Sequence, residues 1–194
     1  MPVGIEVISD NGSRVFDQNM QTLAVSDSGT YPANPPPFSS IRDMVAKGQE
    51  LSGSFKWWKF SPVESTEKFG LQVFDATGKL TFCAARKSAR FVDSFLIGRW
   101  DNPPVTRSYP SGRTYAVFSS VMQFTDVEKR GVGITEEYKI TNRFVTSSVN
   151  GISVTAGWDE TLINDWQPVP PGGIPSFPSP AYAPVIIVLD VTNY

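Results

Sequence analysis

The sequence predicts an all-β protein, an antiparallel β-sandwich or open barrel with a repeated β-hairpin and one short helix. Three observations lead to this prediction. Many short segments alternate apolar and polar residues, turn signals separate them at fairly even spacing, and one segment occurs twice. With 194 residues, 40% of them hydrophobic, the chain is long enough for one sizeable domain.

The repeated segment is "GIEVISDNGSRVFDQN", which begins at Gly4 and returns from Gly70 as "GLQVFDATGKLTFCAA". The spacing of 66 residues from Gly4 to Gly70 also separates Phe16 from Phe82, so the two copies share one register. Apolar residues alternate within each copy, as in a half-buried strand. The sequence therefore predicts two related hairpins, within 4–25 and 70–91, with both phenylalanine side chains buried.

A glycine near the middle of each copy marks the predicted turn. Asn11 and Gly12 interrupt the alternation in the first copy, and Thr77 and Gly78 interrupt it in the second. Asn-Gly supplies the two positive-φ residues that a tight hairpin turn requires. Gly12 and Gly78 are therefore predicted to lie in equivalent turns.

Further alternating segments are predicted to be strands, and one segment is predicted to be a helix. The expected strands lie within 21–26, 51–62, 89–100, 113–124 and 133–146, and a short strand follows a turn at Asn150 and Gly151. In 133–146, one face carrying Glu137, Lys139 and Thr141 is expected to be solvated. The helix is expected at "SIRDMVAKG", residues 40–48, because Ile41, Met44 and Val45 fall on one helical face and Gly48 can end it.

The last part of the chain differs in composition from the rest. We expect a β-rich domain over 1–167, followed by a proline-rich arm and a terminal strand over 168–194. Seven prolines from Pro168 to Pro184 prevent regular ladder pairing and favour an extended segment. The run "VIIVLDV" that follows has no alternation, as in a strand covered on both faces. This strand is expected to dock on the domain itself or on a neighbouring subunit.

The composition excludes several classes of chemistry. The chain has no histidine and one cysteine, Cys83, so His-dependent nucleophiles, His zinc sites and multi-cysteine metal sites are ruled out in their usual forms. Paired carboxylates could still hydrolyse a glycoside, but the adjacent Asp159 and Glu160 would point to opposite faces of a strand. No catalytic residue, cofactor-binding residue or metal ligand is predicted, and we expect a protein that is not an enzyme.

Charge and hydropathy exclude two kinds of partner. Charged residues make up 19% of the chain, the net charge is −2, and lysine and arginine are scattered, so nucleic acid is not an expected partner. No apolar run is long enough to span a membrane, and the first residues lack the features of a signal peptide. We expect a chain that is made in the cytosol and does not insert into a membrane.

The tryptophans open two interpretations. Flat indole faces can stack on sugar rings while neighbouring carboxylates bind the hydroxyls. Equally, tryptophan fills sandwich cores and anchors protein interfaces, and this second interpretation is favoured. The candidate glycan or interface contacts are Trp100, Asp101, Trp158, Asp159 and Trp166.

The pattern of both hairpins, Gly-apolar-x-Val followed by Gly-x-x-x-Phe, with Asp17 after the first phenylalanine, resembles the opening of a family of small phage proteins. These are structural proteins encoded near the tail-fibre and host-specificity genes of tailed bacteriophages. The resemblance covers residues 4–17 well and 70–82 in part, since Cys83 replaces the acidic residue in the second copy. It implies a virion protein at the tail tip or on a tail fibre, made in the host cytoplasm, with no catalytic role.

Two functions therefore remain as expectations. The first is a structural subunit of a phage tail, with other tail proteins as partners and a homo-oligomer as a further candidate state. The second is a carbohydrate-binding β-sandwich that recognises a glycan on the host surface. A tail subunit can also touch receptor sugar, so the two do not exclude each other.

Overall fold

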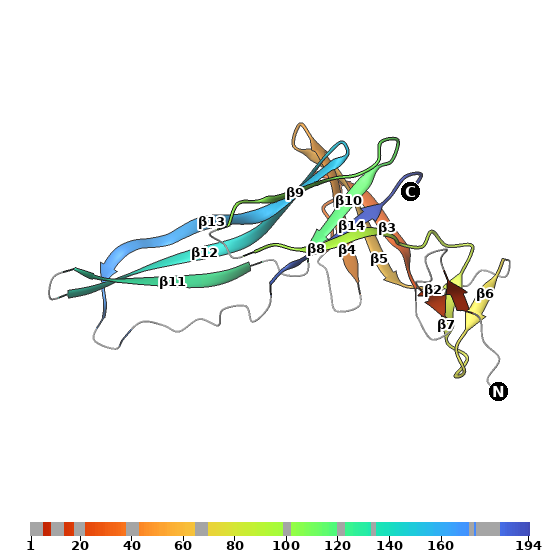
Figure 1. The fold of residues 1–194 in the computed structure, drawn as a ribbon, viewed down its shortest axis with the longest axis horizontal. Coiled ribbons are helices and arrows are strands. Elements are labelled where there is room, and N and C mark those ends of the chain that lie inside the picture. The colour runs from red at the N-terminus through yellow and green to blue at the C-terminus, as the bar shows by residue number, and fades with distance from the viewer. Residues whose placement is uncertain are drawn as a thin grey trace.

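The computed structural model describes residues 6–8, 14–17, 22–37, 43–64, 70–98, 102–119, 123–132, 135–170, 173 and 183–194. These residues form antiparallel strands arranged in four sheets (Figure 1). None of the described residues is helical. The prediction of an all-β protein of the sandwich or open-barrel type is confirmed, and its helix is wrong.

The largest sheet has six strands in the order β3-β5-β4-β10-β14-β8. Its strands are β3 (Leu23–Tyr31), β4 (Met44–Leu51), β5 (Ser54–Pro62), β8 (Arg90–Leu96), β10 (Tyr115–Ser119) and β14 (Val185–Asp190). Strand β14 lies between β10 and β8 of the same chain, with Val188 opposite both Val117 and Asp93. The last strand of the chain therefore lies inside this sheet.

A second sheet has four strands in the order β11-β12-β13-β9. Its strands are β9 (Val105–Ser108), β11 (Gln123–Val132), β12 (Thr135–Asn150) and β13 (Ser153–Pro168). Both β12 and β13 have 16 residues, and β9 pairs only with residues 153–156 of β13. The strand after Gly151, which was expected to be short, is therefore one of the two longest that the structure describes.

Among the described residues, the two large sheets pack on each other near the turn that joins β12 to β13. A hydrophobic cluster there combines Val149, Val154 and Ala156 with Val117 and Val188 of the six-stranded sheet. A second cluster, which includes Trp58, Phe60, Ala116 and Leu189, covers the opposite side of β10 and β14. Successive strand residues point to opposite faces, so both faces of β14 are buried. This explains the unbroken aliphatic run in the sequence.

The rest of the second sheet extends away from this core. We call this part the projecting sheet, and it consists of β11, residues 135–144 of β12 and residues 157–168 of β13. In Figure 1 it points to the left, on the side of the molecule opposite the two small hairpins.

Each copy of the repeated segment forms a two-stranded hairpin. The hairpins are β1 (Glu6–Ile8) with β2 (Arg14–Asp17), and β6 (Gln72–Phe74) with β7 (Leu80–Cys83). Val7 pairs with Phe16 in the first and Val73 with Phe82 in the second, and an irregularity follows the valine in both. The repeat of the hairpin is confirmed down to its pairing register.

The turn of the second hairpin is one residue longer than the predicted Thr77-Gly78 pair. Gly78 has a φ of 81° and donates to the Asp75 carbonyl, and the Asp75 amide donates to the Lys79 carbonyl, which closes a loop of three residues. Phe82 is half-buried rather than buried. Gly12 lies outside the described residues, and for Phe16 the structure describes the strand but not the side chain.

The segment predicted as a helix is strand β4 where the structure describes it. Met44, Ala46 and Gly48 are buried while Val45 and Lys47 are half-buried, and the strand pairs with β5. Small and apolar residues here fit a period of two as well as a helical period, and pairing with β5 and β10 decides between them. Residues 40–42 lie outside the described residues.

Two smaller differences concern individual strands. Thr141 was expected on a solvated face of β12, but it is buried, whereas Glu137 and Lys139 are half-buried. Strand β3 continues to Tyr31, well beyond the predicted strand in 21–26. Its last residue pairs with Phe55 and stacks on that ring, at 5.0 Å between ring centroids.

Candidate functional site

The projecting sheet has unusual edges. Among the described residues, no strand pairs with the outer edge of β11 or with the outer edge of β13 over 157–168. Leu162 and Ile163 on β13 are 51% and 54% exposed. Open sheet edges with exposed apolar residues are templates for pairing with another chain. The projecting sheet is therefore a candidate assembly surface.

A buried arginine holds the three strands of the projecting sheet together. The Arg143 side chain on β12 is 4% exposed and contacts Asp126 and Glu128 of β11 at 3.1 and 2.9 Å. On its other side it donates to Glu160 of β13. Register places Asp126, Glu160 and Arg143 on one face of the sheet, since Glu160 is directly opposite Arg143 and Asp126 is opposite Thr141. Glu160, considered in the sequence as a catalytic carboxylate, has a structural role here.

Trp166 lies on the same face, nearer the far end of the sheet. The Arg130 guanidinium is 4.1 Å from the centre of its indole ring, and the Lys139 ammonium is 5.8 Å away. Two nitrogens of Arg130, Nε and Nη2, also donate to one carboxylate oxygen of Glu137, at 2.9 and 2.7 Å. The indole thus lies close to one cation from β11 and one from β12.

Trp158 and Asp159 lie near the base of the projecting sheet. The Trp158 indole nitrogen donates to the Gly98 carbonyl at 2.9 Å, and the half-buried ring packs against the cluster between the two sheets. Asp159 is exposed, and one of its oxygens accepts from the Glu160 amide at 2.8 Å. Eight residues separate Trp158 from Trp166 on β13, about 25 Å at the usual rise of a strand, so they do not converge on one sugar ring.

The remaining tryptophans divide into two groups. Trp57 and Trp58 are both buried, and the Trp57 indole nitrogen donates to the Asn34 carbonyl at 2.7 Å. These two side chains are part of the interior of the protein. The candidate contacts Trp100 and Asp101 lie outside the described residues.

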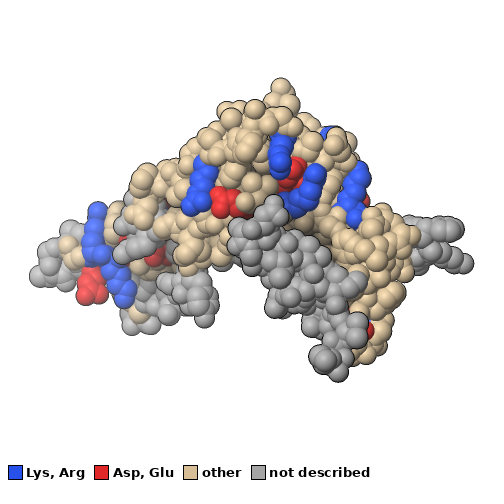
Figure 2. Space-filling view, turned by 45° about the vertical axis from the view of Figure 1, so that its right-hand side comes forward, with Lys and Arg blue, Asp and Glu red and all other residues tan. Residues whose placement is uncertain are grey.

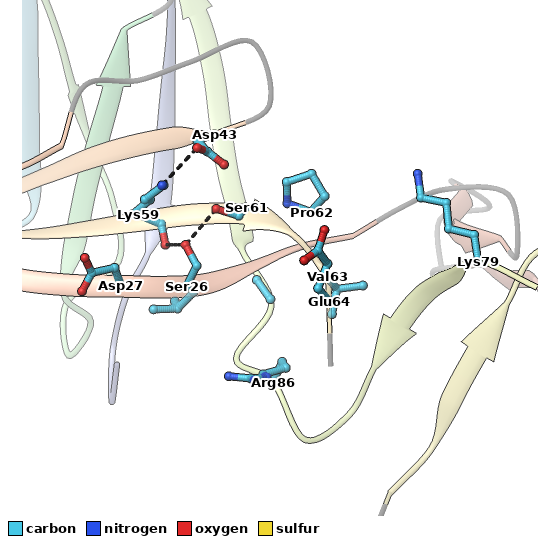
Figure 3. A pocket seen from close by; sticks show the side chains of 12 residues that line it. Ser26, Asp27, Asp43, Lys59, Ser61, Pro62, Val63, Glu64, Lys79 and Arg86 are labelled. Atoms are coloured by element: carbon cyan, nitrogen blue, oxygen red, sulfur yellow. Dashed lines mark hydrogen bonds and ion pairs between the residues drawn. The ribbon is translucent and has the colours of Figure 1, made fainter. Parts of the chain in front are cut away.

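A second surface was not suggested by the sequence. An open hollow of about 910 Å³ lies between the edge of the six-stranded sheet and the second hairpin (Figure 3). Its polar lining includes Ser26, Asp27, Asp43, Lys59, Ser61, Glu64, Lys79 and Arg86. No single motif could have indicated it, because these residues come from five separate parts of the chain.

Hydrogen bonds organise one side of the hollow. The Lys59 ammonium is 3.1 Å from the Asp43 carboxylate, and the Ser26 and Ser61 hydroxyls are 2.8 Å apart. Glu64 and Lys79 stand on the other side in Figure 3 and are exposed. The lining therefore offers hydroxyls, carboxylates and cations together, and the described residues that form it include no aromatic side chain.

Charge is mixed over the surface. Figure 2 shows lysine and arginine side chains interspersed with aspartate and glutamate, without a broad region of one sign on this face. Within the described ranges no group of three or more His, Cys, Asp or Glu residues is arranged to hold a metal ion. The described part of the chain also contains no helix with the length and hydrophobicity to cross a bilayer.

Comparison of the chain with protein families, with curated proteins and with solved structures found no match. The geometry of the projecting sheet and of the hollow therefore carries the functional argument, together with the hairpin pattern.

Proposed function

We propose that this protein is a non-enzymatic structural component of a bacteriophage tail, at the tail tip or on a fibre, that acts through protein–protein assembly. The observation that carries the assembly role is the projecting sheet, which extends beyond the core and leaves both of its long edges open among the described residues. The assignment to a phage tail is supported by the hairpin pattern of residues 4–17 and 70–82.

Labelling of purified phage particles tests this proposal. Antibody raised against the purified chain is bound to particles of the phage that encodes it and is located by electron microscopy. We expect label at the distal end of the tail, and no label on particles assembled without the gene. Particles that lack the protein while the infected cell contains it would contradict a structural role in the virion.

The hollow favours carbohydrate binding as a second candidate function. Its mixture of serine hydroxyls, carboxylates and cations can donate to and accept from the hydroxyls of a polar ligand such as a sugar. Because none of the described lining residues is aromatic, binding to them would rest on hydrogen bonds rather than on ring stacking.

A glycan array with the purified protein tests the second candidate. Lys79 and Arg86 are exposed on the rim, so Lys79→Ala with Arg86→Ala should abolish any glycan signal without lowering the melting temperature. Lys56→Ala, an exposed lysine on β5 outside the lining, is the matched control. A glycan signal that survives the double substitution would place the sugar elsewhere.

A further inference from the structure

The two open edges of the projecting sheet differ in charge. Residues 157–168 of β13 contain no lysine or arginine; they contain Asp159 and Asp165, and also Glu160, which Arg143 binds. Strand β11 carries Lys129 and Arg130, while its Asp126 and Glu128 are both bound by Arg143. Lys129 is exposed and takes part in none of the ion pairs of the described residues. One edge is therefore acidic, and the other presents a cation that has no ion-pair partner among the described residues.

The edges also match in length and direction. Strand β11 has 10 residues, and the open part of β13 has 12, over 157–168. Both strands run antiparallel to β12, so they run parallel to each other within one chain. When two copies lie side by side with their projecting sheets pointing the same way, β13 of one copy meets β11 of the next in parallel orientation.

Both β11 and β13 pair with β12, so the pairing shows which residues of the two edges lie at the same level along the sheet. Ile140 pairs with Val127 and with Asn164, and Tyr138 pairs with Lys129 and with Gln167. Between copies at equal height, Asp165 would lie between the levels of Val127 and Lys129. The exposed Ile163 would lie next to the level of Val127. Acidic and apolar residues of one edge thus reach cationic and apolar residues of the other without a shift.

Pairing of two β13 edges is disfavoured by charge. Two copies of β13 in antiparallel contact around Leu162 would bring Asp165 of each copy opposite Asp159 of the other, and like charges directly opposite are destabilising. A contact between unlike edges is heterologous, and it repeats from copy to copy because each copy keeps one free edge of each kind.

From these observations we infer that the occupant of the β13 edge is strand β11 of a second copy of this chain, so that projecting sheets join side by side into one continuous sheet. The inference deepens the proposed function, since it names the partner of the assembly surface. Continuation of the sheet would pair the open backbone groups of both edges and cover Leu162 and Ile163.

Two charge-reversed variants test this inference in the full-length chain. The first is Asp159→Lys with Asp165→Lys, which changes only the β13 edge. The second is Lys129→Glu with Gly131→Glu, which changes only the β11 edge, where an added side chain at Gly131 meets open space. Molar mass is followed by sedimentation over a range of concentrations, and folding by thermal unfolding.

We expect the wild-type chain to self-associate, and each variant alone to have a dissociation constant raised about tenfold, because the favourable charge pair between Asp165 and Lys129 becomes a repulsive one. An equal mixture of the two variants should associate again, because both kinds of junction in the mixture bring opposite charges together. If the first variant loses stability, Asp159→Asn with Asp165→Asn retains the amide-accepting oxygens and should raise the constant about threefold.

Matched controls and contrary outcomes follow from the same structure. Glu50→Lys on β4 is the control for the acidic edge, since Glu50 is an exposed carboxylate outside both the projecting sheet and the hollow. Lys56→Glu is the control for Lys129. The inference would be overturned if the wild-type chain stayed monomeric. It would also be overturned if either charge-reversed variant associated as tightly as wild type.

These outcomes are separable from those of the particle-labelling experiment. If the chain is monomeric in solution but the antibody labels the tail, the self-pairing is overturned and the proposed function still stands. A chain that self-associates as inferred but is absent from particles would overturn the phage-tail assignment and leave the self-pairing.

Discussion

Asp190 on β14 is an example of a buried charge with complete compensation. The residue is 4% exposed, its carboxylate lies 3.1 Å from Arg113 and 3.4 Å from Arg90, and it accepts from the Thr192 amide. Burial raises the pKa of this carboxyl, but the hydrogen bonds from Thr192 and the two arginines together outweigh burial and hold the pKa below its usual value. The charged form is therefore the one that the folded protein stabilises.

The shift of Asp190 has a predictable pH dependence. A carboxyl whose pKa is lower in the folded than in the unfolded chain stabilises the fold above the unfolded value, about 4, and the effect is lost as pH falls through the folded value. We expect Asp190→Asn to lower the free energy of unfolding at pH 7 by about 1 kcal/mol, a modest figure because both arginines are half exposed.

Urea unfolding of both proteins at pH 7 and at pH 3 measures this effect. The difference between wild type and Asp190→Asn should narrow at pH 3, because the unfolded carboxyl takes up a proton below pH 4 more readily than the folded one, whose pKa is lower. A difference that is equal at the two pH values would show that the charge of Asp190 contributes nothing.

At the scale of the element, a buried cluster of ion pairs joins the three strands of the projecting sheet. Its ladder hydrogen bonds join three strands, and the Arg143 side chain adds contacts to carboxylates on both neighbours. Removal of a buried ion-pair partner is costly because the remaining charges lose their compensation. Arg143 is thus expected to matter more than the exposed arginines of the same sheet.

We predict that Arg143→Leu lowers the free energy of unfolding by about 3 kcal/mol, the lower end of the usual range because the carboxylates keep partial access to water. Amide hydrogen exchange measured along the chain should show faster exchange in β11 and in 157–168 of β13, with β14 still protected. Arg130→Leu, which removes a half-exposed arginine, should cost less than about 1 kcal/mol. Equal effects of the two substitutions would refute the special role of Arg143.

At the scale of the whole molecule, β14 joins parts that are distant in the sequence. It pairs with β10 and β8, and its side chains enter both large hydrophobic clusters, with Val188 in one and Leu189 in the other. Without it, β8 would lose its only partner among the strands of the six-stranded sheet.

We therefore predict that a chain ending at Gln167 is insoluble or unfolded. Each large aliphatic side chain removed from a core costs about 2–5 kcal/mol, and this truncation removes Ile186, Val188 and Leu189 together. Circular dichroism and solubility after expression measure the outcome. Co-expression of a peptide spanning 183–194 should recover folded protein, and a well-folded monomer from the truncated chain alone would contradict the prediction.

The sequence by itself determined the features that depend on neighbouring residues. Alternation of apolar residues predicted most strands, and a constant spacing predicted two related hairpins. Their pairing registers agree, since Val7 pairs with Phe16 in the first and Val73 with Phe82 in the second. Strand formation and tight turns depend on backbone preferences within a few residues, so these signals lie in the local sequence.

Only the tertiary structure decided which strands pair and how far they extend. Residues 44–48 fit both a helical period and a strand period, and they form a strand because they pair with β5 and β10. The run at 185–190 could have docked on its own domain or on a neighbouring subunit, and it pairs with β10 and β8 of the same chain. Of the candidate site residues, Trp158 and Trp166 could be named from the sequence, but their separation along β13, the contacts of Arg143 and the hollow could not. Sheet order and strand length depend on contacts between residues far apart in the chain, and no local pattern carries that information.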